Sequence, residues 1–158
     1  MFQLTKRGDY GVLAVYHIAQ QPLGTFISID EIATQSHIPR AFLSKILQDL
    51  CRGGILYSRR GFGGGFTLAR SASHISLRDV VNSVEGKSSL VNCVGDSEQC
   101  PRMPQCLVAP FWNELQAIVD ELLGSITVTD LIEPEKHYQM LRQLDQYRQQ
   151  FHTPKPSA

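Results

Sequence analysis

The sequence lacks the long apolar runs that membrane-spanning proteins need. No stretch approaches the roughly 18 consecutive apolar residues that a helix requires to cross a bilayer. The N-terminus, MFQLTKRGDYG, has no apolar segment followed by a small-residue cleavage site, so no export signal is visible. Both absences predict a soluble protein of the cytoplasm, where thiols stay reduced.

Motifs typical of several site classes are also missing. The glycines at 61–65 match neither GxGxxG nor GxxxxGK[ST], which excludes a nucleotide-binding loop there. The four cysteines are too few for a disulfide-dense scaffold, and they form neither CxxC pairs of a zinc knuckle nor the CxxCxxC run of a bacterial ferredoxin. No arrangement of His and Asp beside a cysteine suggests a nucleophile. We therefore expect that the protein is not an enzyme.

A net charge is absent as well, but the charges are unevenly distributed. The 15 basic and 15 acidic residues cancel over the whole chain of 158 residues. Residues 1–72 contain eight basic and four acidic side chains and carry +4, whereas residues 73–158 carry −4. This asymmetry favours a basic half that binds an anion, although a difference of four can also arise by chance.

Apolar periodicity predicts three helices followed by a hairpin in the basic half. The expected helices span residues 4–20, 28–36 and 40–52, and a glycine-rich turn at 61–65 joins strands at 55–60 and 66–70. The third helix places an apolar stripe on one face, made of Phe42, Leu43, Ile46, Leu47 and Leu50. Three helices and a two-stranded hairpin are the pattern of a winged helix-turn-helix.

The acidic half is predicted to consist of helices on either side of one loop. A capped helix begins at Ser76, residues 86–106 form a loop, and an apolar stripe predicts a long helix over 107–126. Residues 129–132 form a further turn, Glu133-Pro134 breaks the chain, and residues 135–151 are helix-prone. The fold class is therefore mainly α with a small β-hairpin wing.

The third helix and the wing supply candidate DNA-binding residues. An outward stripe on the helix offers side chains that read base edges in a major groove. Two arginines precede the small glycine tip, which fits a minor groove whose field attracts Arg. The alternatives are an ordinary solvated helix face and a flexible turn. The candidates are Arg40, Ser44, Lys45, Gln48, Arg59 and Arg60.

Three of the four cysteines lie on the 86–106 loop. Cys93, Cys100 and Cys106 are separated by six and five residues. Soft thiolates in a reducing compartment select zinc, copper(I) or an iron–sulfur cluster, and wide spacings suit a cluster better than a single ion. A fourth ligand must then come from elsewhere. Free cysteines are the alternative, and Cys51, on the third helix beside Leu50, is expected to pack rather than ligate.

Three features together resemble the IscR/NsrR family of winged-helix iron–sulfur regulators. They are the segment LTKRGDYG at 4–11, the wing RGFGGGF at 60–66, and the cysteine triad followed by a Trp-containing helix. The resemblance covers residues 2–132. It implies a homodimer in which the long helix crosses its partner's copy, and three cysteines that hold a cluster, with 4Fe–4S favoured over 2Fe–2S.

The resemblance also bears on the fourth ligand. Some members use a His directly after the third cysteine, but here Leu107 follows Cys106. Nitric-oxide-sensing members use an Asp near the N-terminus of the other subunit, and Asp9 stands at that position. The first cysteine gap is one residue longer than the five common in the family. Alternatively, Asp9 is an exposed acid that the helix dipole favours.

These inferences combine into one expected organisation. A winged helix-turn-helix DNA-binding domain occupies 1–72, a linking helix and cluster loop 73–106, a dimerisation helix 107–132 and a C-terminal tail 133–158. The expected function is a dimeric repressor whose binding to a double-stranded operator is controlled by a cluster sensing iron–sulfur status, nitric oxide or redox stress. Three alternatives stay open: a regulator with redox thiols or zinc, an iron–sulfur electron carrier that does not bind DNA, and a partner-binding adaptor.

Overall fold

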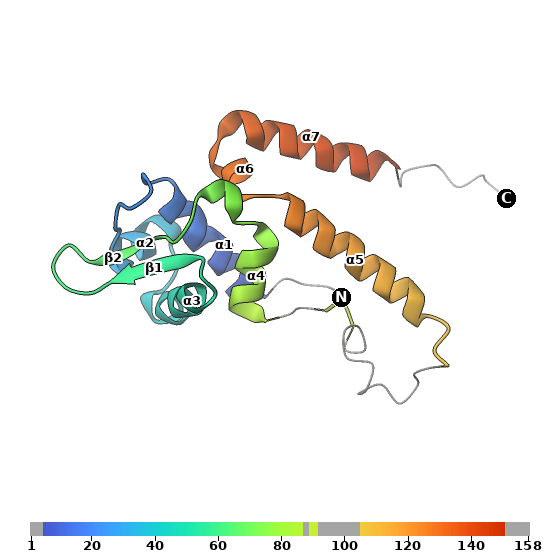
Figure 1. Cartoon of the computed structure of the whole chain (residues 1–158), viewed down its shortest axis with the longest axis horizontal. Helices are drawn as coiled ribbons and strands as arrows, with labels where there is room; N and C mark the ends of the chain where they lie inside the picture. Colours follow the sequence, from blue (N-terminus) through green and yellow to red (C-terminus); the bar gives the residue numbers. More distant parts are fainter. Residues whose placement is uncertain (1–4, 87–88, 92–104, 151–158) are drawn as a thin grey trace.

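The fold is built from helices and one hairpin (Figure 1). A computed structural model describes residues 5–86, 89–91 and 105–150. In chain order the elements are α1 (Lys6–Ala19), α2 (Ile29–Ser36), α3 (Arg40–Arg52), β1 (Leu56–Arg59), β2 (Gly65–Leu68), the 3₁₀ turn η1 (Ala72–His74), α4 (Leu77–Glu85), α5 (Ala109–Ser125), α6 (Val128–Ile132) and α7 (Pro134–Gln150). The mainly helical fold with a small hairpin wing is confirmed.

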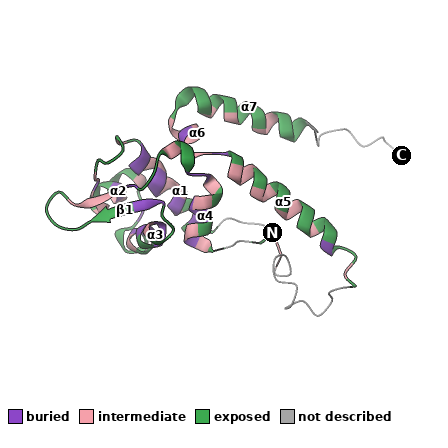
Figure 2. Ribbon diagram, viewed as in Figure 1, coloured by how far each residue is buried: buried purple, intermediate pink, exposed green. Residues whose placement is uncertain are grey.

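The hydrophobic core lies within the winged-helix body. Helices α1 to α4 and the hairpin surround it, and the buried residues concentrate there (Figure 2). The strands pair antiparallel, from Leu56 opposite Leu68 to Arg59 opposite Gly65. The fully buried side chains include Ile18, Ile32, Leu43, Ile46, Leu47, Leu50, Ile55, Ile75 and Val80. This core fixes α3 and the hairpin relative to each other.

Local sequence determines where several helices begin. Capping boxes, in which a hydroxyl and a carboxylate three residues later exchange hydrogen bonds with the backbone, start α2, α4 and α6. In α2, hydrogen bonds from the hydroxyl and backbone of Ser28 hold the pKa of Glu31 below its ordinary value. The boxes pair Ser28 with Glu31, Ser76 with Asp79 and Thr127 with Asp130.

Small residues let α4 approach α1 closely. Gly8 and Gly11 are buried on α1. A Cβ at Gly11 would lie 2.9 Å from Cγ2 of Val84, so a larger residue would push α4 away. The end of α4 is therefore held against the first turns of α1.

The base of the wing is tied to the helical body. The backbone of Phe66 exchanges hydrogen bonds with Ile27, at N–O distances of 3.0 and 2.9 Å. Gly65 has φ +147°, and a Cβ there would meet the Ile27 carbonyl oxygen at 2.3 Å, which makes glycine necessary. The tip residue Phe62 is fully exposed. The wing is thus a projecting tip on a fixed base.

The structure corrects one detail of the sequence prediction and agrees with two element boundaries. The side chain of Phe42, predicted on the buried stripe of α3, is 64% exposed, because it lies at the edge of that stripe. Helix α3 begins at Arg40, as predicted, and Pro39 is its N-cap. The predicted helix over 107–126 corresponds to α5, and the predicted further turn at 129–132 corresponds to α6, which Thr127 caps after the extended Ile126.

Helices α5 and α7 extend away from the core (Figure 1), whereas α6 packs against α1 and contributes Val128 to the core. Helix α5 packs against α4, and α7 begins at Pro134 beside α6 (Figure 1). Ala109 is the only buried residue of α5, whereas Phe111 and Ile118 are 61% and 50% exposed. Within the described ranges, no helix combines the length and apolarity that crossing a membrane requires.

Candidate nucleic-acid interface and cluster site

Helix α3 presents the predicted base-reading residues outward. Its apolar stripe anchors the opposite side in the core. Arg40, Lys45 and Gln48 are exposed, and Ser44 is half-buried. Arg40 forms an ion pair with Asp30 of α2. Both partners of that pair are more than half exposed, so releasing Arg40 toward a phosphate or base costs little.

The two wing arginines differ in their surroundings. The guanidinium of Arg59 lies 4.1 Å from the ring centroid of Phe26 and donates a hydrogen bond to the Gly63 carbonyl at 2.8 Å. Arg60 is exposed, and among the described residues its side chain has no hydrogen bond or ion pair. Arg59 therefore stabilises the wing through these contacts, and Arg60 is available to bind an external anion.

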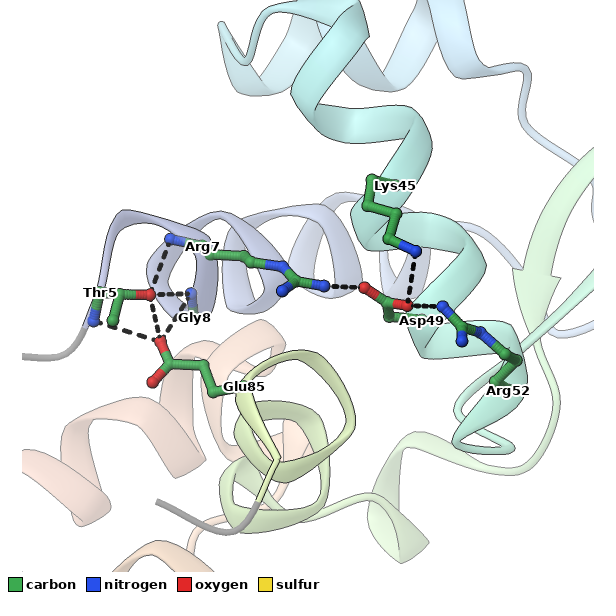
Figure 3. Close-up of polar contacts among 7 residues, drawn as sticks. All are labelled: Thr5, Arg7, Gly8, Lys45, Asp49, Arg52 and Glu85. Carbon is green, nitrogen blue, oxygen red and sulfur yellow. Dashed lines mark hydrogen bonds and ion pairs between the residues drawn. The ribbon is translucent and has the colours of Figure 1, made fainter. Parts of the chain in front are cut away.

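A buried carboxylate connects α3 with α1 (Figure 3). The side chain of Asp49 is only 8% exposed and accepts hydrogen bonds from Arg7 of α1 and Arg52 of α3. The Nζ of Lys45 lies 3.9 Å from Oδ1 of the same carboxylate. Sequence reasoning missed this cluster. The available signal was an acid beside the apolar stripe, with cations four residues before it and three after it.

A second carboxylate connects α4 with the start of α1 (Figure 3). One oxygen of Glu85 accepts hydrogen bonds from the Thr5 hydroxyl at 2.6 Å, the Thr5 backbone N–H at 3.2 Å and the Gly8 N–H at 3.0 Å. The positive end of α1 thus binds an acid at the C-terminus of α4. The sequence signal, also missed, was a carboxylate at a helix end where the dipole disfavours it.

The first turn of α1 therefore lies between two polar clusters. Its Thr5 and Gly8 bind the end of α4, and its Arg7 binds α3. Asp9 belongs to the same turn and is exposed. Within the described ranges its carboxylate makes no hydrogen bond or ion pair, which leaves it available as a ligand. Glu85 immediately precedes residues 86–106, the segment that contains the three clustered cysteines.

One loop cysteine lies within the described residues. Cys106 is half-buried and unpaired, and its carbonyl accepts a hydrogen bond from the N–H of Ala109, the first residue of α5, at 3.3 Å. Cys93 and Cys100 lie outside the described residues, and no set of three metal-binding side chains converges in the part of the chain that the structure describes. A free thiol and a free carboxylate fit the expected donors of a cluster.

Cys51 lies on α3, away from Cys106 in the sequence. It packs against the hydrophobic core, and burial raises the pKa of its thiol despite a hydrogen bond involving Ser58. A raised pKa lowers the thiolate fraction that metal ligation needs. The location of Cys51 agrees with packing rather than ligation.

Comparison with known proteins finds one family over most of the chain. The model of the Rrf2 family, described as iron-dependent transcriptional regulators, matches residues 4–134. The protein rrf2 of Nitratidesulfovibrio vulgaris is 32% identical over 130 residues, covering 82% of this chain and 87% of that protein. The transcriptional regulator IscR of Xenorhabdus nematophila is 28% identical over 134 residues, covering 85% and 81%.

A solved structure shares the fold. CymR, described as the global cysteine regulator of B. subtilis, aligns with a TM-score of 0.66 and 26% identity, over 84% of this chain and 97% of that one. The relatives are transcriptional regulators rather than enzymes. With its winged-helix fold and outward α3, this chain belongs to the Rrf2 family of transcriptional regulators.

Proposed function

We propose that the protein is a cytoplasmic, homodimeric repressor whose affinity for its operator is set by an iron–sulfur cluster. The observation that carries this proposal is the connection of the exposed α3 face to the cysteine-bearing segment through α1. Glu85 and Asp49 hold opposite sides of the first turn of α1, and both use hydrogen bonds to groups of that turn. A structural change in the cysteine-bearing segment would therefore reach α3 through the hydrogen bonds and ion pairs of the first turn of α1.

DNA recognition would use the exposed face of α3 together with the wing. Arg40, Ser44, Lys45 and Gln48 would contact base edges in the major groove, and Arg60 would enter the minor groove. Arg59 would hold the wing in shape through Phe26 and Gly63. Cationic contacts to phosphates make such binding steeply dependent on salt.

Homodimerisation is supported by the apolar surface of α5. A single chain leaves Phe111 and Ile118 exposed on a 17-residue helix that packs against α4 near the body. These two residues lie seven positions apart and so share one face of α5, and exposed apolar residues on one face are typical of an interaction site. A two-fold dimer would carry two α3 helices and would therefore bind a pseudo-palindromic operator.

Cys93, Cys100 and Cys106 would hold the cluster together with Asp9 from the partner chain. The available Asp9 carboxylate and the unpaired Cys106 thiol support this ligand set. A bound 4Fe–4S cluster, favoured over 2Fe–2S, would supply a centre that reacts with nitric oxide and oxidants. Because Asp9 belongs to the same turn as Arg7 and follows Thr5 by four residues, ligation of Asp9 would fix the turn that contacts α3 and α4.

Substitutions on the proposed DNA face test this function directly. A duplex selected from a random-sequence library with the wild-type protein serves as the probe. We expect Lys45→Ala and Arg60→Ala each to lower affinity by about tenfold, since one base or phosphate contact contributes about 1–3 kcal/mol. Fluorescence anisotropy at several salt concentrations measures the affinity and its salt dependence.

The matched control is Arg148→Ala on α7. This cation is paired with Asp145, and the helix that carries it contacts mainly α6 rather than α3 or the hairpin. This variant should bind the duplex as tightly as the wild type, with the same salt slope. Equal affinities for all three variants would contradict the assignment of α3 and the wing as the DNA face.

A further inference from the structure

The tip of the wing presents one aromatic side chain to solvent. Phe62 is fully exposed and follows the exposed Arg60 by two residues, in the loop that Figure 1 shows projecting away from the helices. We propose that Phe62 inserts between two stacked base pairs from the minor groove and bends the operator at that step. The inference rests on the proposed DNA binding and deepens it, because insertion adds a second source of sequence specificity to the base contacts of α3.

Backbone hydrogen bonding places Phe62 in a tight turn at the end of the hairpin. The N–H of Gly64 donates to the carbonyl of Gly61 at 2.9 Å, so Phe62 is the second of four residues in this turn. The third residue, Gly63, has φ +70°, which a type II turn requires at that position. The ring of Phe62 is covered by no neighbouring side chain. It therefore projects from the end of the wing.

Three contacts hold the tip in this conformation. Besides the hydrogen bond of the turn, the guanidinium of Arg59 donates to the Gly63 carbonyl at 2.8 Å, and Arg59 pairs with Gly65 across the hairpin. A Cβ at Gly64 would lie 2.3 Å from the carbonyl oxygen of Arg59, so only glycine lets the turn close. A residue on a tip that is already ordered loses little conformational freedom on insertion, which favours binding.

The size and polarity of the tip suit the minor groove. This groove is about 6 Å wide in B-form DNA. Gly61, Gly63 and Gly64 carry no side chains, so one backbone turn and one aromatic ring are all that must enter. Proteins that bend DNA from the minor groove insert apolar side chains, Phe among them, which partly unstack one base step and kink the duplex by about 20–90°. Phe62 has the position and the chemistry for this insertion.

The charge of the hairpin favours DNA over a protein as the partner. Residues 55–70 contain three arginines and no acid. The side chain of Arg60 has no hydrogen bond or ion pair among the described residues, so its charge is available to phosphates beside the inserted ring. Protein-binding surfaces are typically contiguous apolar patches, whereas the neighbours of Phe62 in the turn are glycines.

Insertion makes the operator sequence matter at a step whose base edges no side chain needs to contact. Pyrimidine–purine steps such as TA and CA kink and unstack more easily than other steps. We therefore expect a step of this kind where each wing tip lies. In a two-fold dimer these steps occur at symmetric places in the two half-sites. Replacing them by other steps should weaken binding even though α3 keeps its contacts.

Phe62→Ala removes the ring, and Phe62→Leu keeps an apolar side chain at the tip. The probe is the library-selected duplex, with the fluorescent base 2-aminopurine placed in turn at each adenine, since unstacking raises its fluorescence. The wild type should raise the fluorescence at the inserted step, Phe62→Leu should do so in part, and Phe62→Ala should not. Energy transfer between dyes on the duplex ends should show a smaller bend with Phe62→Ala.

Affinity and its salt dependence separate the ring from the neighbouring charge. We expect Phe62→Ala to weaken binding by about fivefold or more, the usual effect of removing an aromatic ring that stacks on a base. The salt slope should stay at the wild-type value because no cation is lost, whereas Arg60→Ala should reduce it. Because Phe62 is fully exposed, its substitution should leave the fold intact, which far-UV circular dichroism checks.

Tyr138→Ala is the matched control. Its aromatic ring is 70% exposed, but it belongs to α7, which contacts mainly α6. The control should match the wild type in fluorescence, bend angle and affinity. Loss of the fluorescence signal and of the bend in Phe62→Ala alone, with the salt slope unchanged, would support the insertion.

Failure of this inference is distinguishable from failure of the proposed function. If Phe62→Ala unstacks and bends the duplex like the wild type, whatever its affinity, the insertion is overturned and DNA binding stands. An equal loss of both signals with Tyr138→Ala would also overturn the insertion. A wild-type protein with which no duplex can be selected would overturn the proposed function and the insertion together.

Discussion

Replacing Cys93, Cys100 or Cys106 by Ala is expected to abolish the visible absorption of anaerobically purified protein. Each cysteine would supply one of only three thiolates, and Asp9, the proposed fourth ligand, binds iron less well than a soft thiolate does. We expect that two thiolates and one carboxylate would not retain the cluster through purification. The measurement is the absorption spectrum, together with counts of iron and sulfide per chain.

Cys51→Ala is the matched control for the triad. The Cys51 thiol packs against the core and has a raised pKa, so its removal should leave iron, sulfide and absorption at wild-type levels. Full absorption in all three triad variants would show that the ligand assignment is wrong. Zinc without sulfide in the wild-type protein would instead support the regulator with a zinc site.

Asp49→Ala is expected to have the largest effect on stability outside the apolar core. The buried carboxylate accepts hydrogen bonds from Arg7 and Arg52, and without it these cations and Lys45 lie near one another unneutralised. Hydrogen bonds to charged groups contribute about 1.5–3 kcal/mol each, and the exposure of the cations reduces the sum. We expect a loss of about 2 kcal/mol in the free energy of unfolding.

Urea unfolding measures this loss, and Asp145→Ala provides the control. Asp145 also pairs with an arginine three residues away, Arg148 at 2.5 Å, but that pair lies on the surface of α7. Its removal should change the unfolding free energy by less than about 0.5 kcal/mol. If the two substitutions cost the same, Asp49 does not hold α3 to α1, and the proposed route from the loop to α3 is lost.

Much of the winged-helix body could be predicted because its signals are local. The capping box of Ser28 and Glu31 starts α2 as expected, and Gly53-Gly54 end α3. The glycine turn between the two strands predicted the hairpin within one or two residues. These patterns depend on the backbone geometry of a few neighbouring residues, which the sequence specifies directly.

The features that could not be predicted depend on contacts between distant segments. Glu85 meets Thr5 across 80 positions, and Arg7 meets Asp49 across 42. Phe42 fits an apolar stripe by spacing, but tertiary packing leaves it exposed. The two wing arginines are equivalent in sequence, and only the position of Phe26 separates the bracing residue from the available one.

The central claim is that a cluster controls the affinity of this protein for DNA. The most direct test measures binding of the library-selected duplex by the same preparation before and after the cluster is removed under anaerobic conditions. The account predicts iron and sulfide in the starting protein and affinities that differ by at least about tenfold, a typical coupling between two sites. Equal affinities of the two forms, or a starting protein without iron and sulfide, would contradict it.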